Sequence, residues 1–293
     1  MPEAQPITRE LTIGEVISKT FDLYRRDFVK YLVVFLIVEV IIGILTTLVL
    51  RAALLPLLTA NPTPQQTLSS LSGFFGAFFA LIVLVILISP IAIGSAIKMT
   101  SQAIEKGQAD LGASVRFTIS KLVWLWALNF ILWVIFTLGF IALIVPGIIL
   151  AIMFSLAVPA ILIENTGVLD GMGRSRKLVD HRWLKSFALY LLVGIFVVIL
   201  AVILSFISAP FGVVSGIVSN ILSAFYLPLV PILLTVYYYS NVARTSPPQS
   251  QPSQVPMAPS AVVTPETKFC PRCGTQMASW ASVCPKCGLQ QPV

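Results

Sequence analysis

The fold is decided by a stretch that reads FFGAFFALIVLVILISPIAIGSAI over residues 74–97. No charged side chain occurs between its first and last residue. An α-helix needs about 20 consecutive apolar residues to cross the hydrocarbon core of a bilayer, which is about 30 Å thick. This stretch is therefore predicted to be a transmembrane helix.

Similar apolar stretches recur along the chain. Of its 293 residues, 57% are hydrophobic and only 11% are charged, a balance that a soluble domain of this size could not bury. We predict an all-α polytopic membrane bundle with six transmembrane helices. Pro146 and Gly147 should form a tight outer hairpin between the third and fourth spans, and Pro228 and Pro231 should bend the last one. Besides 74–97, the predicted spans are 31–50, 122–145, 148–163, 187–207 and 221–240.

The basic residues indicate how the chain is oriented. Lys and Arg gather in the N-terminal segment and in the loops 98–121 and 164–186, whereas the loops on the opposite side contain only Arg51. Cytoplasmic loops are enriched in Lys and Arg. We therefore expect a multi-pass protein of the cell membrane with both termini in the cytoplasm. The net charge of +7 follows from the same asymmetry, and we favour that reading over a nucleic-acid surface.

Residues 1–30 are predicted to form an amphipathic segment at the inner membrane surface. Thr12 and Glu15 have the spacing of a capping box, in which each residue satisfies a free N–H group of the other. Apolar residues then recur at three- and four-residue steps as far as Phe28, which is typical of a helix with one apolar face. Basic stretches near Gly112 and Gly171 resemble this segment. They indicate either a threefold repeat with inner-face amphipathic helices or a simple likeness of composition.

The C-terminal part of the chain differs from the rest. Residues 31–244 form the predicted membrane domain, and residues 245–267 are rich in Pro, Ser, Gln and Thr, which predicts a disordered linker. Residues 268–293 contain all the cysteines of the chain, as two C-x2-C pairs separated by ten residues. Such pairs predict a zinc ribbon, in which two turns supply four thiolates to one tetrahedral metal. The metal ligands are Cys270, Cys273, Cys284 and Cys287.

The predicted metal site is structural. Four protein ligands leave no position for a reactive water. Zinc is favoured, although iron also accepts four thiolates, and a redox dithiol pair is the alternative to a metal. Zinc ribbons are generally taken as interaction modules, so we expect a cytoplasmic protein partner. Nucleic acid is a weaker alternative, because the ribbon offers only three cations: Lys268, Arg272 and Lys286.

A few polar residues fall within or beside the predicted spans. Glu39 is the only acid well inside one, and an ionised side chain there costs roughly 2.5–3.5 kcal/mol. We expect it to hydrogen bond with Asn129, either as a clasp between helices or as part of an ion or proton pathway. Glu164 and Arg174 should form an ion pair at the inner rim. His181 is interpreted as a surface residue.

Three motifs together resemble a known family. LTIGEVISKTF opens the chain at residues 11–21, VPGI stands at 145–148, and AVPAILIE at 157–164 is followed by GVL at 167–169 and by Arg174 and Ser175. This combination resembles a largely uncharacterised prokaryotic family of six-span membrane proteins, similar to the membrane domain of some glycerophosphoryl diester phosphodiesterases. The resemblance covers residues 10–240 and implies the fold. The hydrolase half of those fusions has no counterpart here, so no phosphodiesterase activity is implied.

These observations favour a membrane scaffold or regulator that presents a cytoplasmic zinc ribbon to a partner. The alternative is a transporter, channel or export accessory subunit that uses the bundle around Glu39, with a small solute as its cargo. We expect no enzyme, because we find no nucleophile elbow, phosphate-binding loop or paired carboxylates in the sequence. We therefore assign no catalytic residue and no cofactor other than the structural zinc.

Overall fold

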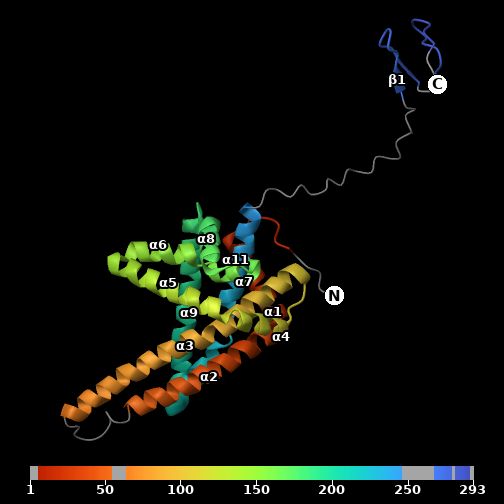
Figure 1. Cartoon of the computed structure of the whole chain (residues 1–293). Helices are drawn as coiled ribbons and strands as arrows, with labels where there is room; N and C mark the ends of the chain where they lie inside the picture. Colours follow the sequence, from red (N-terminus) through yellow and green to blue (C-terminus); the bar gives the residue numbers. More distant parts are fainter. Residues whose placement is uncertain (1–5, 55–63, 246–266, 279–280, 291–293) are drawn as a thin grey trace. The chain divides into compact units, whose positions relative to one another are not determined.

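The computed structural model describes residues 6–54, 64–245, 267–278 and 281–290. The chain divides into two units, Met1–Ser246 and Pro247–Val293, which are described separately. The first unit is built from α-helices, and the second contains two short strands (Figure 1). Most of the predicted linker, residues 246–266, lies outside the described residues.

Among the described residues, five helical segments are long and apolar enough to cross a membrane. Three of the six predicted spans lie within single helices: α2 (Phe28–Leu54), α3 (Pro64–Lys106) and α9 (Trp183–Ser208) contain the stretches that begin at residues 31, 74 and 187. The predicted span 122–145 is too long at its end, because α5 (Leu122–Ala142) stops at Ala142. The fifth segment, Val145–Glu164, combines α6 (Ile144–Phe154) and α7 (Ala157–Glu164). The remaining predicted span, 221–240, is not one continuous helix.

That span is divided between two helices. Helix α10 (Ser215–Ser223) ends before a turn, and α11 (Leu229–Thr245) begins after it. Proline lacks the N–H group and fits best in the first turn of a helix, where that group has no partner within the helix. Pro228 therefore precedes α11 and Pro231 lies in its first turn, where the sequence predicted only a bend. Residues 209–223, predicted largely as an outer loop, form a 3-10 helix (Ala209–Val214) followed by α10.

Short helices precede three of the long ones. Helix α1 (Ile13–Arg26) leads into α2, α4 (Leu111–Ser120) leads into α5, and α8 (Val168–Val179) leads into α9. Only one residue separates the first two pairs, namely Asp27 and Lys121. This arrangement matches the threefold pattern noted in the sequence. The capping box of α1 is present as predicted, since the Glu15 N–H donates to Thr12 and the Thr12 N–H donates to Glu15.

The hairpin between α5 and α6 differs from the prediction in its turning point. Extended backbone at Leu143 separates the helices, and Pro146 and Gly147 lie in the first turn of α6. A side chain on Gly147 would meet the Phe140 ring at 2.8 Å. Glycine therefore lets α6 approach α5 closely.

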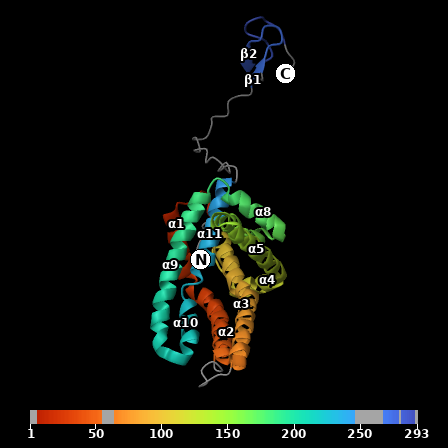
Figure 2. The ribbon, with the colours of Figure 1, turned by 90° about the vertical axis from the view of Figure 1, so that its left-hand side faces the viewer.

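Helix α11 lies at the centre of the first unit. It contacts α1, α3, α7 and α8, and Ile232, Val236 and Tyr237 are almost completely buried. Figures 1 and 2 show α11 beside α1, and α2 alongside α3. The apolar face of α1, with Val16 buried, thus packs on protein.

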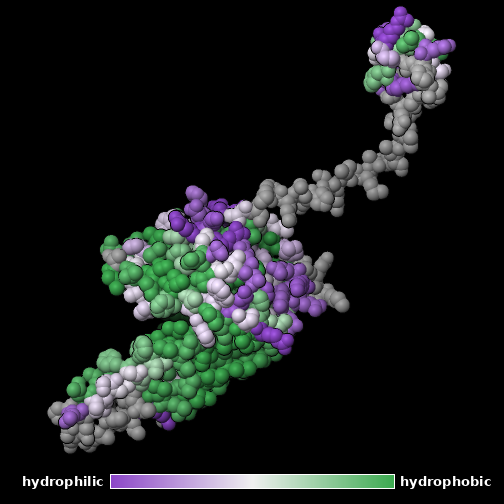
Figure 3. Space-filling view, in the orientation of Figure 1, coloured by the Kyte–Doolittle hydropathy of each residue, from purple (hydrophilic) through white to green (hydrophobic). Residues whose placement is uncertain are grey.

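The outer surface of the first unit is apolar over large areas. Figure 3 shows hydrophobic residues covering α2 and α3 on one face, whereas hydrophilic residues gather where α1, α8 and the end of α11 lie. Large side chains such as Phe79, Trp133 and Phe206 are more than half exposed. Such a surface is unusual in a soluble monomer and is typical of helices that contact lipid.

Candidate functional site

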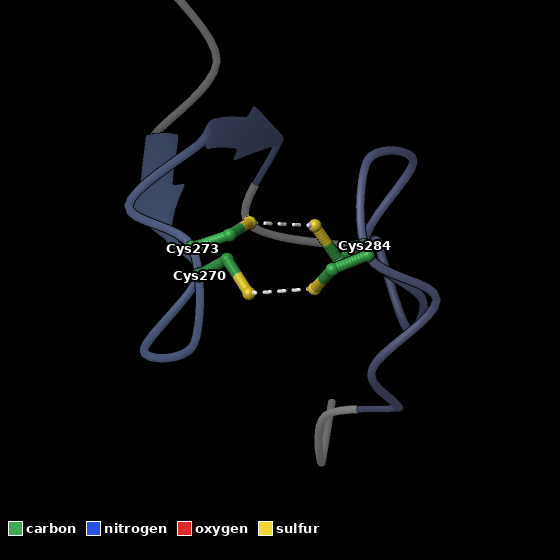
Figure 4. Close-up of side chains that lie close together, drawn as sticks. Cys270, Cys273 and Cys284 are labelled. Atoms are coloured by element: carbon green, nitrogen blue, oxygen red, sulfur yellow. Dashed lines mark hydrogen bonds between the residues drawn. The ribbon is translucent and has the colours of Figure 1, made fainter.

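The four cysteines of the second unit form a compact cluster (Figure 4). Their sulfur atoms all lie within 4.8 Å of one another, and the Cys270–Cys287 and Cys273–Cys284 separations are both 3.6 Å. A disulfide would need about 2.05 Å. A tetrahedron with metal–sulfur bonds of about 2.3 Å has edges of about 3.8 Å. The cluster therefore fits a single four-coordinate metal ion, and the four predicted ligands are the residues brought together.

Two equivalent turns hold these sulfurs. In the first, the Gly274 N–H donates to the Cys270 carbonyl at 2.8 Å, and in the second the Gly288 N–H donates to the Cys284 carbonyl at 2.9 Å. Both glycines have positive φ, 69° and 71°, which a residue with a side chain adopts only with strain. The strands β1 (Thr267–Phe269) and β2 (Gln276–Ala278) pair antiparallel around the first turn. The spacing of the two motifs in sequence therefore reflects a repeated local structure.

Burial in this unit is concentrated at the cluster. Among its described residues, Cys270 and Cys284 are the buried ones, at 2% and 1% exposure. Phe269 is 64% exposed and Val283 46% exposed, so neither contributes much to a core. Among the described residues, burial is thus centred on the sulfur atoms, as it is in small modules that fold around a metal.

Thr275 hydrogen bonds to one of the four sulfur atoms, a role that the sequence analysis did not identify. Its hydroxyl lies 3.3 Å from the Cys273 sulfur. This hydrogen bond, with a second from the backbone of Thr275, lowers the pKa of Cys273 to about 6. The thiolate needed for metal ligation is thus favoured at neutral pH. The second turn has Leu289 at the equivalent position, which has no hydroxyl group. Aligning the two turns in the sequence would have pointed to Thr275.

The predicted pair of Glu39 and Asn129 is not formed. The Asn129 amide donates to the Leu125 carbonyl of its own helix at 2.9 Å. Glu39 accepts instead from the Ser223 hydroxyl of α10, at a long 3.4 Å. The reason is the packing order: α2 contacts α3 and α10, whereas α5 contacts α3 and α6.

A cavity of about 310 Å³ adjoins Glu39 between α2, α3 and α11. Glu39 and Ser89 are the polar side chains in its lining. A transport pathway for a small ion would require a continuous polar lining, and the described lining does not have one. The other lining residues are Phe35, Val38, Ala92, Ile93, Leu227, Val230, Pro231 and Leu234.

Glu164 and Arg174 form the predicted ion pair, with Arg174 Nε 2.8 Å from Glu164 Oε1. The Tyr238 hydroxyl donates to the same carboxylate oxygen at 2.5 Å, a contact that the sequence did not predict. His181 lies apart from this group, with its side chain 88% exposed and its Nε2 3.5 Å from Asp180. His181 is therefore a surface residue, as predicted, and does not join the pair of Glu164 and Arg174.

Three consecutive tyrosines of α11 connect it to three other helices. The Tyr237 hydroxyl lies 2.7 Å from Ser186 Oγ on α9, Tyr238 contacts α7 through Glu164, and Tyr239 donates to Glu105 on α3. Tyr237 and Ser186 are both fully buried. These contacts join α11 to its neighbours, so the polar side chains at these helix ends have a structural role.

Comparison with known proteins identified no relative: no family model, curated protein or solved structure matches the chain.

Proposed function

We propose that this protein is an integral membrane scaffold or regulator whose six-span helical domain anchors a zinc ribbon in the cytoplasm. The ribbon binds a protein partner and thereby recruits it to the membrane. The resemblance to the six-span prokaryotic family supports the same architecture. Zinc is the metal that best suits four thiolates in a tetrahedral arrangement.

The observation that carries this proposal is the closed four-sulfur cluster in a unit of its own. A metal held by four protein ligands has no open position for a substrate, so its role is to fold the module. What the folded module then offers is its surface. Phe269 is 64% exposed on β1, next to Lys268, and exposed aromatic side chains often anchor protein interfaces.

The test is affinity capture of the tagged full-length protein from solubilised membranes. Three matched variants separate the possible roles: deletion of residues 268–293, Cys273→Ser with Cys287→Ser, and Phe269→Ser. We expect the same partner to be lost with all three, while Phe269→Ser retains its metal. An unchanged set of captured proteins after the deletion would contradict the proposal.

Nuclease treatment and a salt series address the nucleic-acid alternative. Binding to phosphates weakens steeply with salt because counterions are released. We expect capture of the protein partner to survive nuclease and to change little in the variant with Arg272→Gln and Lys286→Gln. Loss of capture under both conditions would favour nucleic acid instead.

A further inference from the structure

The cavity beside Glu39 has the size of a small ligand site. Its volume of about 310 Å³ lies at the lower end of the range for small-molecule pockets, about 300–1,000 Å³. Its lining is apolar apart from one carboxylate and one hydroxyl, those of Glu39 and Ser89. Pockets that bind small molecules commonly combine an apolar wall with a few polar groups that orient the ligand.

Glu39 has no counter-ion among the described residues. Within the part of the chain that the structure describes, no Lys, Arg or His forms an ion pair with it. Its hydrogen bond from Ser223 is long, at 3.4 Å, and a hydroxyl does not neutralise a carboxylate. Acidic side chains inside a membrane are normally paired or face a cavity, and they mark functional sites.

The lining of the cavity does not suit a calcium or magnesium ion. Calcium takes six to eight oxygen ligands and magnesium takes six, and both are bound through several carboxylates, carbonyls or waters. The cavity offers oxygens from Glu39 and Ser89 only, beside apolar side chains such as Phe35 and Leu234. A ligand that fits must therefore bring one positive charge and its own apolar surface.

We propose that this cavity binds a hydrophobic organic cation with one protonated amine. The ammonium group donates a hydrogen bond to the Glu39 carboxylate, and the apolar part packs against Phe35, Val38 and Leu234. Phe35 is 3% exposed and Val38 is 6% exposed, so both are held in position before a ligand arrives. This site is distinct from the zinc ribbon and does not depend on its partner.

The test uses two ligands that differ only in charge, 2-(1-naphthyl)ethylamine and 2-(1-naphthyl)ethanol. Binding is measured by equilibrium dialysis of the full-length protein in phosphatidylcholine nanodiscs, with empty nanodiscs subtracted. We expect the wild-type protein to bind the amine at least tenfold more tightly than the alcohol. A difference of tenfold corresponds to about 1.4 kcal/mol. Equal binding of the two ligands would overturn the proposal without any variant.

Variants locate the site. We expect Glu39→Gln to abolish the preference for the amine, while Glu39→Asp retains part of it. Asn129→Ala is the matched control, because the Asn129 amide donates to the Leu125 carbonyl of its own helix and Asn129 does not line the cavity. It should bind as the wild type does. A preference that survives in folded Glu39→Gln protein would show that Glu39 is only a clasp to Ser223, which would also overturn the proposal.

An ammonium group can belong to a free amine or to the headgroup of an aminolipid. Repeating the dialysis in nanodiscs that contain phosphatidylethanolamine separates these sources. Weaker binding of the naphthyl amine there would identify the aminolipid as an occupant, and unchanged binding would identify a free amine.

Discussion

Removal of the metal should expose all the thiols of this protein at once. The four cysteines of the chain are also the four residues of the cluster. A thiol count on the intact, full-length protein therefore reports on this centre alone, with no need for mutation. The perturbation is a strong chelator added to purified protein under anaerobic conditions.

The metal should contribute most of the free energy that stabilises the folded ribbon, because the described residues bury few apolar side chains. Cys270 and Cys284 are the buried side chains among its described residues, and Phe269 is largely exposed. Structural zinc contributes about 10–16 kcal/mol in modules of this kind. A binding free energy of 10 kcal/mol corresponds to a dissociation constant of about 10⁻⁷ M, and 16 kcal/mol to about 10⁻¹² M, so purified protein at micromolar concentration should retain most of its zinc until a chelator competes for it.

The assay combines a thiol-reactive chromophore with a zinc indicator. Before chelation we expect almost no reactive thiol within minutes; after chelation we expect four thiols and one zinc ion per chain. Cys273→Ser serves as a control and should have three reactive thiols from the start. Four reactive thiols in freshly purified protein, or loss of thiols in pairs on mild oxidation, would refute the reasoning and favour a redox dithiol. Elemental analysis distinguishes zinc from iron.

Three other perturbations act on the helical unit. Burial alone would raise the pKa of Glu10, but its ion pairs with Arg182 and Lys185 lower that pKa overall. The stability that these pairs contribute is therefore lost as the pH falls through the lowered pKa. Glu10→Gln should reduce the loss of thermal stability at acid pH, as measured by circular dichroism. Tyr237→Phe and Ser186→Ala should each reduce the free energy of unfolding in detergent by about 1–3 kcal/mol, and the double variant by less than the sum, because each single change leaves a buried hydroxyl unpaired. Gly171→Ala would place a methyl group 2.4 Å from a side chain of α7 and should cost about 1–3 kcal/mol, whereas Gly173→Ala, with nothing within 4 Å, should not destabilise α8 in the same assay.

The features that could be predicted from sequence are those set by neighbouring residues. The capping box of Thr12 and Glu15 depends on four residues, and each cysteine turn depends on five. Residues 74–97 lie within one helix because an uncharged run of that length has few alternatives in lipid. The ion pair of Glu164 and Arg174 could also be predicted from the sequence, because a short connection joins their helices.

Contacts between distant helices could not be predicted in this way. Glu39 and Ser223 are 184 positions apart. A helix that is apolar on every side carries no stripe to show which face meets which neighbour. The predicted pairing of Glu39 with Asn129 was wrong for this reason. The broken span at 221–240 has a local cause in Pro228 and Pro231, but hydropathy alone does not distinguish a bent helix from two helices.

The two proposed sites can be tested independently because they use different chemistry in different units. The ribbon depends on thiolates and a metal, whereas the cavity depends on one carboxylate and apolar side chains. Cys273→Ser should therefore leave the binding of the naphthyl amine unchanged, and Glu39→Gln should leave the zinc content and the captured partner unchanged. A ribbon variant that altered amine affinity would mean that the units are energetically coupled, since a change in one binding free energy requires a reciprocal change in the other. The protein would then act as a receptor that reports an amine in the membrane to a partner of the ribbon, rather than as a scaffold with a separate ligand site.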